Sequence, residues 1–294
     1  MSPEYRKTCN LCGSGQLKRL DDACNICQCS SCGYIFDNPR PSSDEIHAYY
    51  SRPGKYDGWL EALAPREILW KRRLDLMRKW KKPGSLLDVG TGIGQFLDVG
   101  RDDFTETCGT EISDSAIRIA KERYGLDVFL GPVEDIDFSN RKFDNITIIH
   151  VLEHVDDPRA VIRKCRALLN EGGMLFIAVP NDIRSIKARA RELFRKTGIH
   201  HQSSGGIYGL PKLTLDGSLG EIHLSHFTPD VLDSMLRREG FEVLEHSLDP
   251  YFVSNGFVRR IAGEMYYRIH RVFFRITGLN LYNTMWVVAQ NRSK

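Results

Sequence analysis

The sequence lacks any long hydrophobic run. None of its 294 residues fall in a stretch of about 18 consecutive apolar side chains, the length that a membrane-spanning helix needs. The stretch before the first cysteine, MSPEYRK, is polar, so no secretory signal is predicted there. A net charge of +3 is too small to favour nucleic acid as a partner. Repeats and low-complexity tracts are also absent, and the 41% hydrophobic content indicates an ordinary globular chain.

A dinucleotide-binding fingerprint is missing as well. After the strand-like segment at 85–90, the glycines at 90, 92 and 94 give G-x-G-x-G, not the G-x-G-x-x-G that lets a pyrophosphate reach a helix N-terminus. Asp88 stands two residues before the first glycine, where a carboxylate repels a diphosphate but can hold an ammonium group. The turn therefore disfavours a nicotinamide-dependent sugar oxidoreductase, which stays an alternative.

Cysteine, in contrast, is concentrated at one end. Six of the eight cysteines lie in the first 32 residues, and four of them form two C-x-x-C knuckles with sixteen residues between them. This spacing is typical of tetrahedral zinc sites with four thiolates, and the glycine after each knuckle suits a turn that needs positive φ. We predict one structural zinc ion held by Cys9, Cys12, Cys29 and Cys32.

A third C-x-x-C pair, Cys24 and Cys27, is followed by Gln28 and lies close to Cys12. These two cysteines are the spare pair, and their role stays open. A disulfide cluster suited to an oxidising compartment is the weaker interpretation of the whole group.

Strand and helix patterns alternate from Ser85 onward. Apolar runs predict strands, and Ser113 or Asp114 and the Asp157–Pro158 pair mark helix starts. The order implies a Rossmann-like, doubly wound, mostly parallel α/β sheet with its ligand at the carboxyl ends of the strands. The predicted strands are 85–90, 105–111, 127–131, 143–151 and 173–180, and the predicted helices are 113–125 and 156–173.

The glycine turn and the acidic residues after it resemble the class I S-adenosylmethionine-dependent methyltransferases. In that family the turn holds the methionine part of the cofactor, an acidic residue ending the second strand binds the ribose, and one after the third strand faces the adenine. The resemblance implies that the cofactor-binding residues are Asp88, Gly90, Gly92, Gly94, Glu111, Glu134, Asp135 and His150.

Three longer segments, NICQCSSCGYIFDNPRPSSDEIHAYY, HVLEHVDDP and HLSHFTPDVLDSMLRREGF, resemble a subgroup with an N-terminal cysteine-knuckle module that is associated with sugars, polysaccharides and natural products. This implies a seven-stranded sheet, a zinc-ribbon-like module and a helical lid. The expected acceptor is a saccharide or related small molecule, with O-methylation favoured over C-methylation. The predicted division is a zinc module at 1–45, a helical cap at 46–84, the cofactor core at 85–182, a lid at 183–228 and the rest of the core at 229–294.

Three histidines are candidate general bases, because imidazole titrates near neutral pH. His154 follows the fourth predicted strand, and His223 and His226 precede a helix start. Each of them could instead be a structural histidine. A further alternative is that Glu153 and His154 bind a divalent metal with His223 or His226.

Two basic segments, 183–196 and 257–278, lie outside the sheet pattern. The second reads as an amphipathic helix that either packs on the domain or a second subunit, or attracts an anionic, nucleotide-linked or lipid-linked sugar at a membrane surface. We expect a cytoplasmic enzyme with no nucleic-acid partner. A non-catalytic, zinc-containing nucleic-acid-binding protein is the other alternative.

Overall fold

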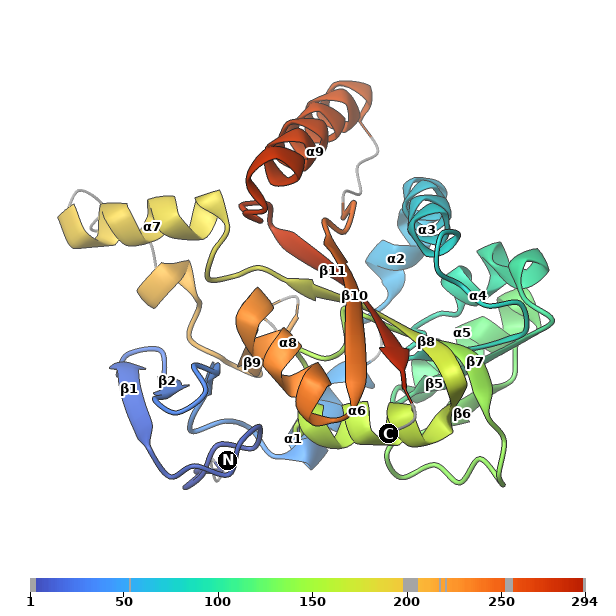
Figure 1. Cartoon of the computed structure of the whole chain (residues 1–294), viewed down its shortest axis with the longest axis horizontal. Helices are drawn as coiled ribbons and strands as arrows, with labels where there is room; N and C mark the ends of the chain where they lie inside the picture. The colour runs from blue at the N-terminus through green and yellow to red at the C-terminus, as the bar shows by residue number, and fades with distance from the viewer. Residues whose placement is uncertain are drawn as a thin grey trace.

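A seven-stranded sheet forms the centre of the protein (Figure 1). The computed structural model describes residues 4–52, 54–197, 206–216, 218–219, 221–251 and 256–292. The strand order is β10-β11-β8-β7-β4-β5-β6, with β11 antiparallel to both neighbours and the other pairs parallel. This confirms the predicted Rossmann-like fold. The strands are β4 (Ser85–Val89), β5 (Glu106–Glu111), β6 (Val128–Leu130), β7 (Phe143–Ile149), β8 (Leu169–Pro180), β10 (Phe241–Ser247) and β11 (Thr284–Asn291).

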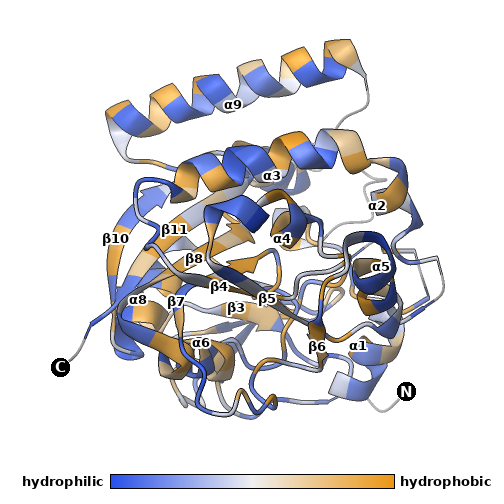
Figure 2. Cartoon of the chain, turned by 90° about the vertical axis from the view of Figure 1, so that its right-hand side faces the viewer, coloured by the Kyte–Doolittle hydropathy of each residue, from blue (hydrophilic) through white to orange (hydrophobic). Residues whose placement is uncertain are grey.

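Helices cover both faces of this sheet. Figure 2 shows α3 (Leu63–Met77) and α4 (Gln95–Val99) above it, and α6 (Pro158–Leu168) and α8 (Pro229–Arg238) below it. Successive residues of β4 divide between the two layers, because side chains alternate along a strand. Leu86 packs with residues of α3 and α4, and Leu87 packs with residues of α6 and α8.

The predicted helix starts are confirmed by their caps. Helix α5 (Asp114–Tyr124) begins after Ser113, whose hydroxyl accepts from the Ala116 amide. Helix α6 begins at Pro158, and the Asp157 carboxylate accepts from the amides of Arg159 and Ala160. These side chains satisfy amides that would otherwise lack a partner in the first turn.

The cysteine-rich segment folds into a second, four-stranded sheet of order β1-β2-β3-β9. Its strands are β1 (Leu17–Asp21), β2 (Ile26–Cys29), β3 (Ile35–Asp37) and β9 (Ser225–His226). Strand β9 comes from a distant part of the chain, and it pairs Ile35 with His226. The Tyr34 hydroxyl also lies 2.5 Å from the Ser225 hydroxyl. The cysteine module is thus joined to the rest of the chain by a strand that the sequence did not reveal.

The remaining elements lie in the connections between these strands, and η1 precedes β5 at the amino edge of the large sheet. They are α1 (Ser43–Tyr50), α2 (Asp57–Glu61), η1 (Arg101–Asp103), α7 (Ile186–Thr197), η2 (Ile207–Gly209) and α9 (Phe257–Thr277). The predicted lid at 183–228 contains α7, η2 and β9, whereas its residues 198–205, 217 and 220 lie outside the described residues. The five-part division of the chain stays a prediction.

Helix α9 forms where the amphipathic pattern predicted it, and it projects from the body of the protein (Figure 1). Its packed side carries Tyr267, which is buried, with Tyr266 and Phe274 against Leu248 and Tyr282. The aliphatic stripe faces away, and its members are all exposed, from 44% for Ile261 to 79% for Ile276: Val258, Ile261, Met265, Ile269, Val272 and Ile276. The interpretation that this stripe packs on the domain is therefore wrong. Within the described part of the chain, none of the helices is both long and apolar enough to cross a bilayer.

Candidate functional site

A cavity of about 620 Å³ opens beside the carboxyl ends of β4, β5 and β7, where the strand order reverses. Most of the predicted cofactor-binding residues line it, namely Gly90, Gly92, Glu111, Glu134, Asp135 and His150. Asp88 lines an adjoining cavity of about 300 Å³. Gly94 lies behind the turn as the N-cap of α4. The structure thus brings these predicted residues to one edge of the sheet, as expected for a parallel α/β fold.

The glycine turn is closely packed against Trp59 and Val151, which line the same cavity. Gly90 and Gly92 have φ values of 70° and 57°, which only glycine adopts without strain. A Cβ atom on Gly92 would stand 2.7 Å from the ring of Trp59, and one on Gly90 would stand 2.4 Å from Val151. A side chain at either position would therefore clash with Trp59 or Val151.

Glu111 is fixed at the end of β5 by backbone amides. One carboxylate oxygen accepts from Gly92 at 2.8 Å, and the other accepts from Ile112 at 2.8 Å and Ser113 at 3.0 Å. Burial raises the pKa of this carboxyl, and the amide donors oppose the effect. The arrangement holds one carboxylate beside the glycine turn, where a ribose hydroxyl could reach it.

Asp88 lies one residue before the end of β4 and is buried, with 4% of its surface exposed. The Thr147 hydroxyl donates to its carboxylate at 2.6 Å. Burial raises the pKa of Asp88 to about 6, although this hydrogen bond opposes the shift. An ammonium group in the adjoining cavity would therefore find an acid that titrates just below neutral pH.

His150, directly after β7, adopts a left-handed backbone with φ of 54° that is uncommon for a non-glycine residue. Its Nε2 lies 2.9 Å from Asp249 and its Nδ1 lies 3.2 Å from Glu153. Asp249 also accepts two hydrogen bonds from Arg73, at 2.8 and 2.7 Å. Burial lowers the pKa of His150, but the two carboxylates outweigh it and raise the pKa to about 9. Arg73 and Asp249 were not predicted from the sequence.

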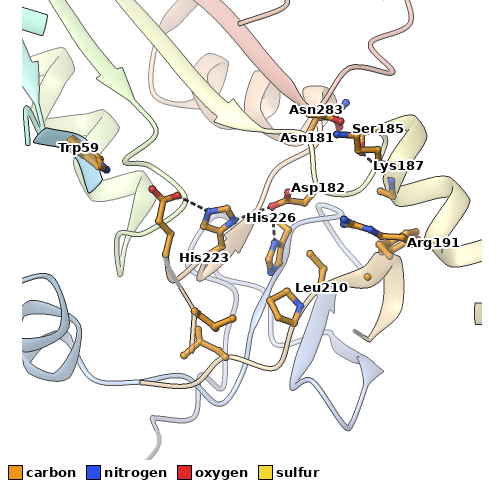
Figure 3. Close-up of a pocket in the computed structure, with 17 residues that line it drawn as sticks. Trp59, Asn181, Asp182, Ser185, Lys187, Arg191, Leu210, His223, His226 and Asn283 are labelled. Carbon is orange, nitrogen blue, oxygen red and sulfur yellow. Dashed lines mark hydrogen bonds and ion pairs between the residues drawn. The ribbon is translucent and has the colours of Figure 1, made fainter. Parts of the chain in front are cut away.

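A second cavity of about 660 Å³ lies beside the first (Figure 3). Lys187 and Arg191 of α7 form part of one wall, and Asp182 and His223 lie across from them. Trp59 and Glu221 line this cavity, the cofactor-side cavity and the adjoining one with Asp88. All three spaces therefore meet at Trp59 and Glu221, neither of which was predicted.

His154 and His223 lie side by side, with ring centroids 5.0 Å apart. The Nδ1 of His154 is 2.5 Å from the Ile222 carbonyl oxygen, and that of His223 is 3.2 Å from Asp182. Burial lowers the pKa of His154. Burial also acts to lower the pKa of His223, but the hydrogen bonds that its ring donates to Asp182 and Glu221 reverse the effect and raise the pKa.

The third histidine candidate is placed differently. His226 is buried in β9, with Nε2 3.1 Å from Asp37 and Nδ1 3.5 Å from Asp182. Both ring nitrogens face carboxylates of the protein, and the residue also lines the second cavity. Its contact with Asp37 ties the core to the cysteine module.

The four predicted zinc ligands converge, and their sulfur atoms all lie within 4.8 Å of one another. The Cys9–Cys32 and Cys12–Cys29 sulfur distances are 3.6 and 3.5 Å. A tetrahedron with Zn–S bonds of about 2.3 Å has edges of about 3.8 Å, so the four thiolates fit this ion. Cys24 and Cys27 lie outside the group, and the Cys27 sulfur is 3.8 Å from the Asn38 carbonyl oxygen.

Known proteins share this architecture. Residues 61–246, more than half of the chain, match the family model described as a methyltransferase domain. A demethylmenaquinone methyltransferase of Thermotoga maritima is 28% identical over 63% of this chain and 80% of its own length. A ubiquinone biosynthesis O-methyltransferase of Coxiella burnetii is 32% identical over 35% of this chain, and the match spans only 45% of that relative.

Solved structures agree in fold. The magnesium protoporphyrin IX methyltransferase of Synechocystis with bound SAH superposes with a TM-score of 0.54 at 12% identity, covering 86% of this chain and all of that one. None of these three names mentions a saccharide. The matched family model, together with the seven-stranded sheet and the cavity at its switch point, shows that the chain belongs to the class I S-adenosylmethionine-dependent methyltransferases.

Proposed function

We propose that this protein methylates a hydroxyl group of a small acceptor that has an apolar part and an anionic part. The observation that carries the proposal is the meeting of two cavities at Trp59 and Glu221. One is lined by the predicted cofactor residues and the other by His223, Lys187 and Arg191. S-adenosylmethionine supplies a methyl group that is already activated on a sulfonium, so the protein has mainly to align the acceptor with it.

The cofactor-side residues would each recognise one part of that molecule. Asp88 offers a carboxylate to the ammonium group, and Glu111 offers one to the ribose hydroxyls. Glu134 and Asp135 border the end of the cavity where the adenine would lie. The amides that hold Glu111 limit its movement, so its carboxylate does not have to be ordered by binding.

His154 and His223 would act at the reacting oxygen. Both lie close to Glu221, where the two cavities meet, and loss of a proton from a hydroxyl there would favour O-methylation. His226 does not line the cofactor-side cavity, and it is buried in β9 with its ring between Asp37 and Asp182.

The acceptor that best suits the second cavity is a saccharide carried on a lipid diphosphate. Lys187 and Arg191 supply positive charge, and Leu210 and Leu213 supply apolar surface. The names of the relatives, which concern quinones and a porphyrin, lend the sugar itself no support. What supports the proposal is that cations and apolar side chains line the same cavity.

The cysteine module would hold one structural zinc ion through Cys9, Cys12, Cys29 and Cys32. Four thiolates complete a tetrahedral zinc site and leave no open position, so the ion would serve folding.

Cofactor binding should weaken in acid because Asp88 becomes protonated. A carboxyl with a pKa of about 6 is mostly ionised at pH 7.5 and about a quarter ionised at pH 5.5. We therefore expect S-adenosylmethionine affinity, measured by calorimetry, to fall about fourfold between these values. Asp88→Asn should bind more weakly at pH 7.5 and lose most of this pH dependence.

The matched control for this experiment is Asp114→Asn, at the exposed start of α5. It should reproduce the pH dependence of the parent. Equal affinity of parent and Asp88→Asn at pH 7.5 would remove the ammonium-binding role from Asp88, and tighter binding of a nicotinamide dinucleotide would overturn the function itself.

Helices α7 and α9 would bring the protein to an anionic membrane surface. Arg271 and Arg275 are exposed beside the outward-facing aliphatic stripe of α9. Each basic residue near an anionic bilayer contributes about 1 kcal/mol. We expect Arg271→Glu with Arg275→Glu to reduce sedimentation with phosphatidylglycerol vesicles by more than about tenfold at low salt.

Reversal of Arg118 and Lys121, which are exposed on α5, changes the net charge equally. This second double variant should sediment like the parent. If both double variants sediment alike, the effect belongs to net charge and not to α9.

A further inference from the structure

We propose that Glu153, His154 and His223 bind one divalent transition-metal ion where the cofactor and acceptor cavities meet. The inference rests on the function proposed above and deepens it, since it assigns a second role to two of the candidate histidines. Each of the three residues offers one ligand atom, and these atoms all lie within 4.8 Å of one another. The site is separate from the cysteine module, which is the other such group among the described residues.

Both imidazoles are oriented as metal ligands usually are. The Nδ1–H of His154 donates to the Ile222 carbonyl oxygen, and that of His223 donates to Asp182. Such bonds fix the ring and its tautomer, and in a neutral imidazole they leave an electron pair on Nε2 for a metal ion that displaces any proton there. The Nε2 of His154 lies 3.8 Å from Glu153, and the Nε2 of His223 lies 3.8 Å from Glu221. Both Nε2 atoms are therefore turned toward carboxylates.

Glu153 supplies an independent observation. It is 1% exposed, and one oxygen of its carboxylate contacts His150. The other oxygen, Oε2, is buried without a hydrogen-bond partner in the described structure. A buried carboxylate oxygen without a partner is costly, and buried charges in proteins are normally paired or bound to a metal. A cation between Glu153 and the two histidines would meet that need.

The ligand set selects the kind of ion. Two imidazoles and one carboxylate suit manganese, iron, cobalt or zinc better than magnesium or calcium, which prefer oxygen ligands. Bonds of about 2.0–2.2 Å require neighbouring ligand atoms roughly 3–3.5 Å apart, so the three side chains would close in by small rotations. Three protein ligands leave coordination positions open for an acceptor oxygen.

A cation in this position explains how the acceptor hydroxyl would be activated. A hydroxyl oxygen bound to a divalent ion loses its proton more readily. Glu221, at the wall shared by the cavities, is placed to accept that proton. The oxygen then forms its bond to the methyl carbon as the carbon–sulfur bond of the sulfonium breaks, and S-adenosylhomocysteine leaves as a neutral thioether.

The test is a titration of the purified, zinc-loaded protein with Mn²⁺, followed by the electron paramagnetic resonance signal of the free ion. The parent should bind one Mn²⁺ more tightly than its weak surface sites. The variants His223→Ala and Glu153→Gln should each bind this ion at least about tenfold more weakly. His246→Ala removes an imidazole that is paired with Asp233 near the surface, and it should match the parent.

Calorimetry with S-adenosylmethionine on the same samples separates the two proposals. If His223→Ala binds S-adenosylmethionine as tightly as the parent does, the variant is folded. A loss of Mn²⁺ binding in this variant then reports on the proposed metal site. Should the parent bind no more Mn²⁺ than this variant does, the metal proposal is overturned, while intact cofactor binding leaves the proposed function standing. If His223→Ala fails to fold, His154→Gln replaces it and must show the same loss.

Discussion

Replacing Cys29 by serine should release the zinc ion and unfold the cysteine module. Structural zinc sites bind with an apparent free energy of about 10–16 kcal/mol, and a module of this size depends on it for folding. Strand β3 lies in that module and pairs with β9. The segment that leads into β9 lines the second cavity, so this part of the cavity wall should lose its support. Metal analysis should find about one zinc per parent chain and little in the variant.

The spare cysteines provide the control. Cys24→Ser and Cys27→Ser should retain zinc, because neither sulfur belongs to the four-sulfur group. Their effect on thermal unfolding should be much smaller than that of Cys29→Ser. Loss of zinc from the two controls and its retention in Cys29→Ser would show that the ligands have been assigned wrongly.

Replacing Asp249 by alanine should cost the protein roughly 3–5 kcal/mol of unfolding free energy. Arg73 is nearly fully buried and Asp249 fully so, and Asp249 is also the partner of His150. Removing the carboxylate leaves a buried guanidinium without its counter-charge. Urea unfolding of parent and variant, followed by circular dichroism, measures the difference.

A matched surface pair shows what an exposed contact contributes. Asp233 and His246 form a pair at 2.7 Å with partly exposed side chains, and Asp233→Ala should cost less than about 1 kcal/mol. Equal costs for the two variants would contradict the assignment of a buried charge pair. The double variant Arg73→Met with Asp249→Leu should recover much of the loss, because it removes both buried charges together.

The sheet and its helices could be predicted because their signals are local. Apolar runs such as 143–149 and caps such as Ser113 and Asp157 depend on neighbouring residues, and the glycine turn carries its own backbone requirement. The four-cysteine cluster could be predicted for the same reason, since each knuckle is a single short turn.

The residues that the sequence did not reveal act across long separations. Asp249 meets His150 over 99 residues, and β9 has only two residues, too few for a periodic pattern. Glu221 stands in a loop without any pattern. Helix α9 was predicted from its period, but the period could not say which of its two apolar faces, aromatic or aliphatic, packs against the core.

Strand β9 also limits how this protein can change length. The residues between Glu221 and His226 run from the meeting point of the cavities to the sheet of the cysteine module, where Ile35 is fixed opposite His226. A single inserted residue in this stretch would shift the pairing by one position and turn its side chains to the opposite face. Insertions that enlarge the acceptor space should therefore be accepted before Glu221, and segment swaps between relatives should cut there and not within 221–228.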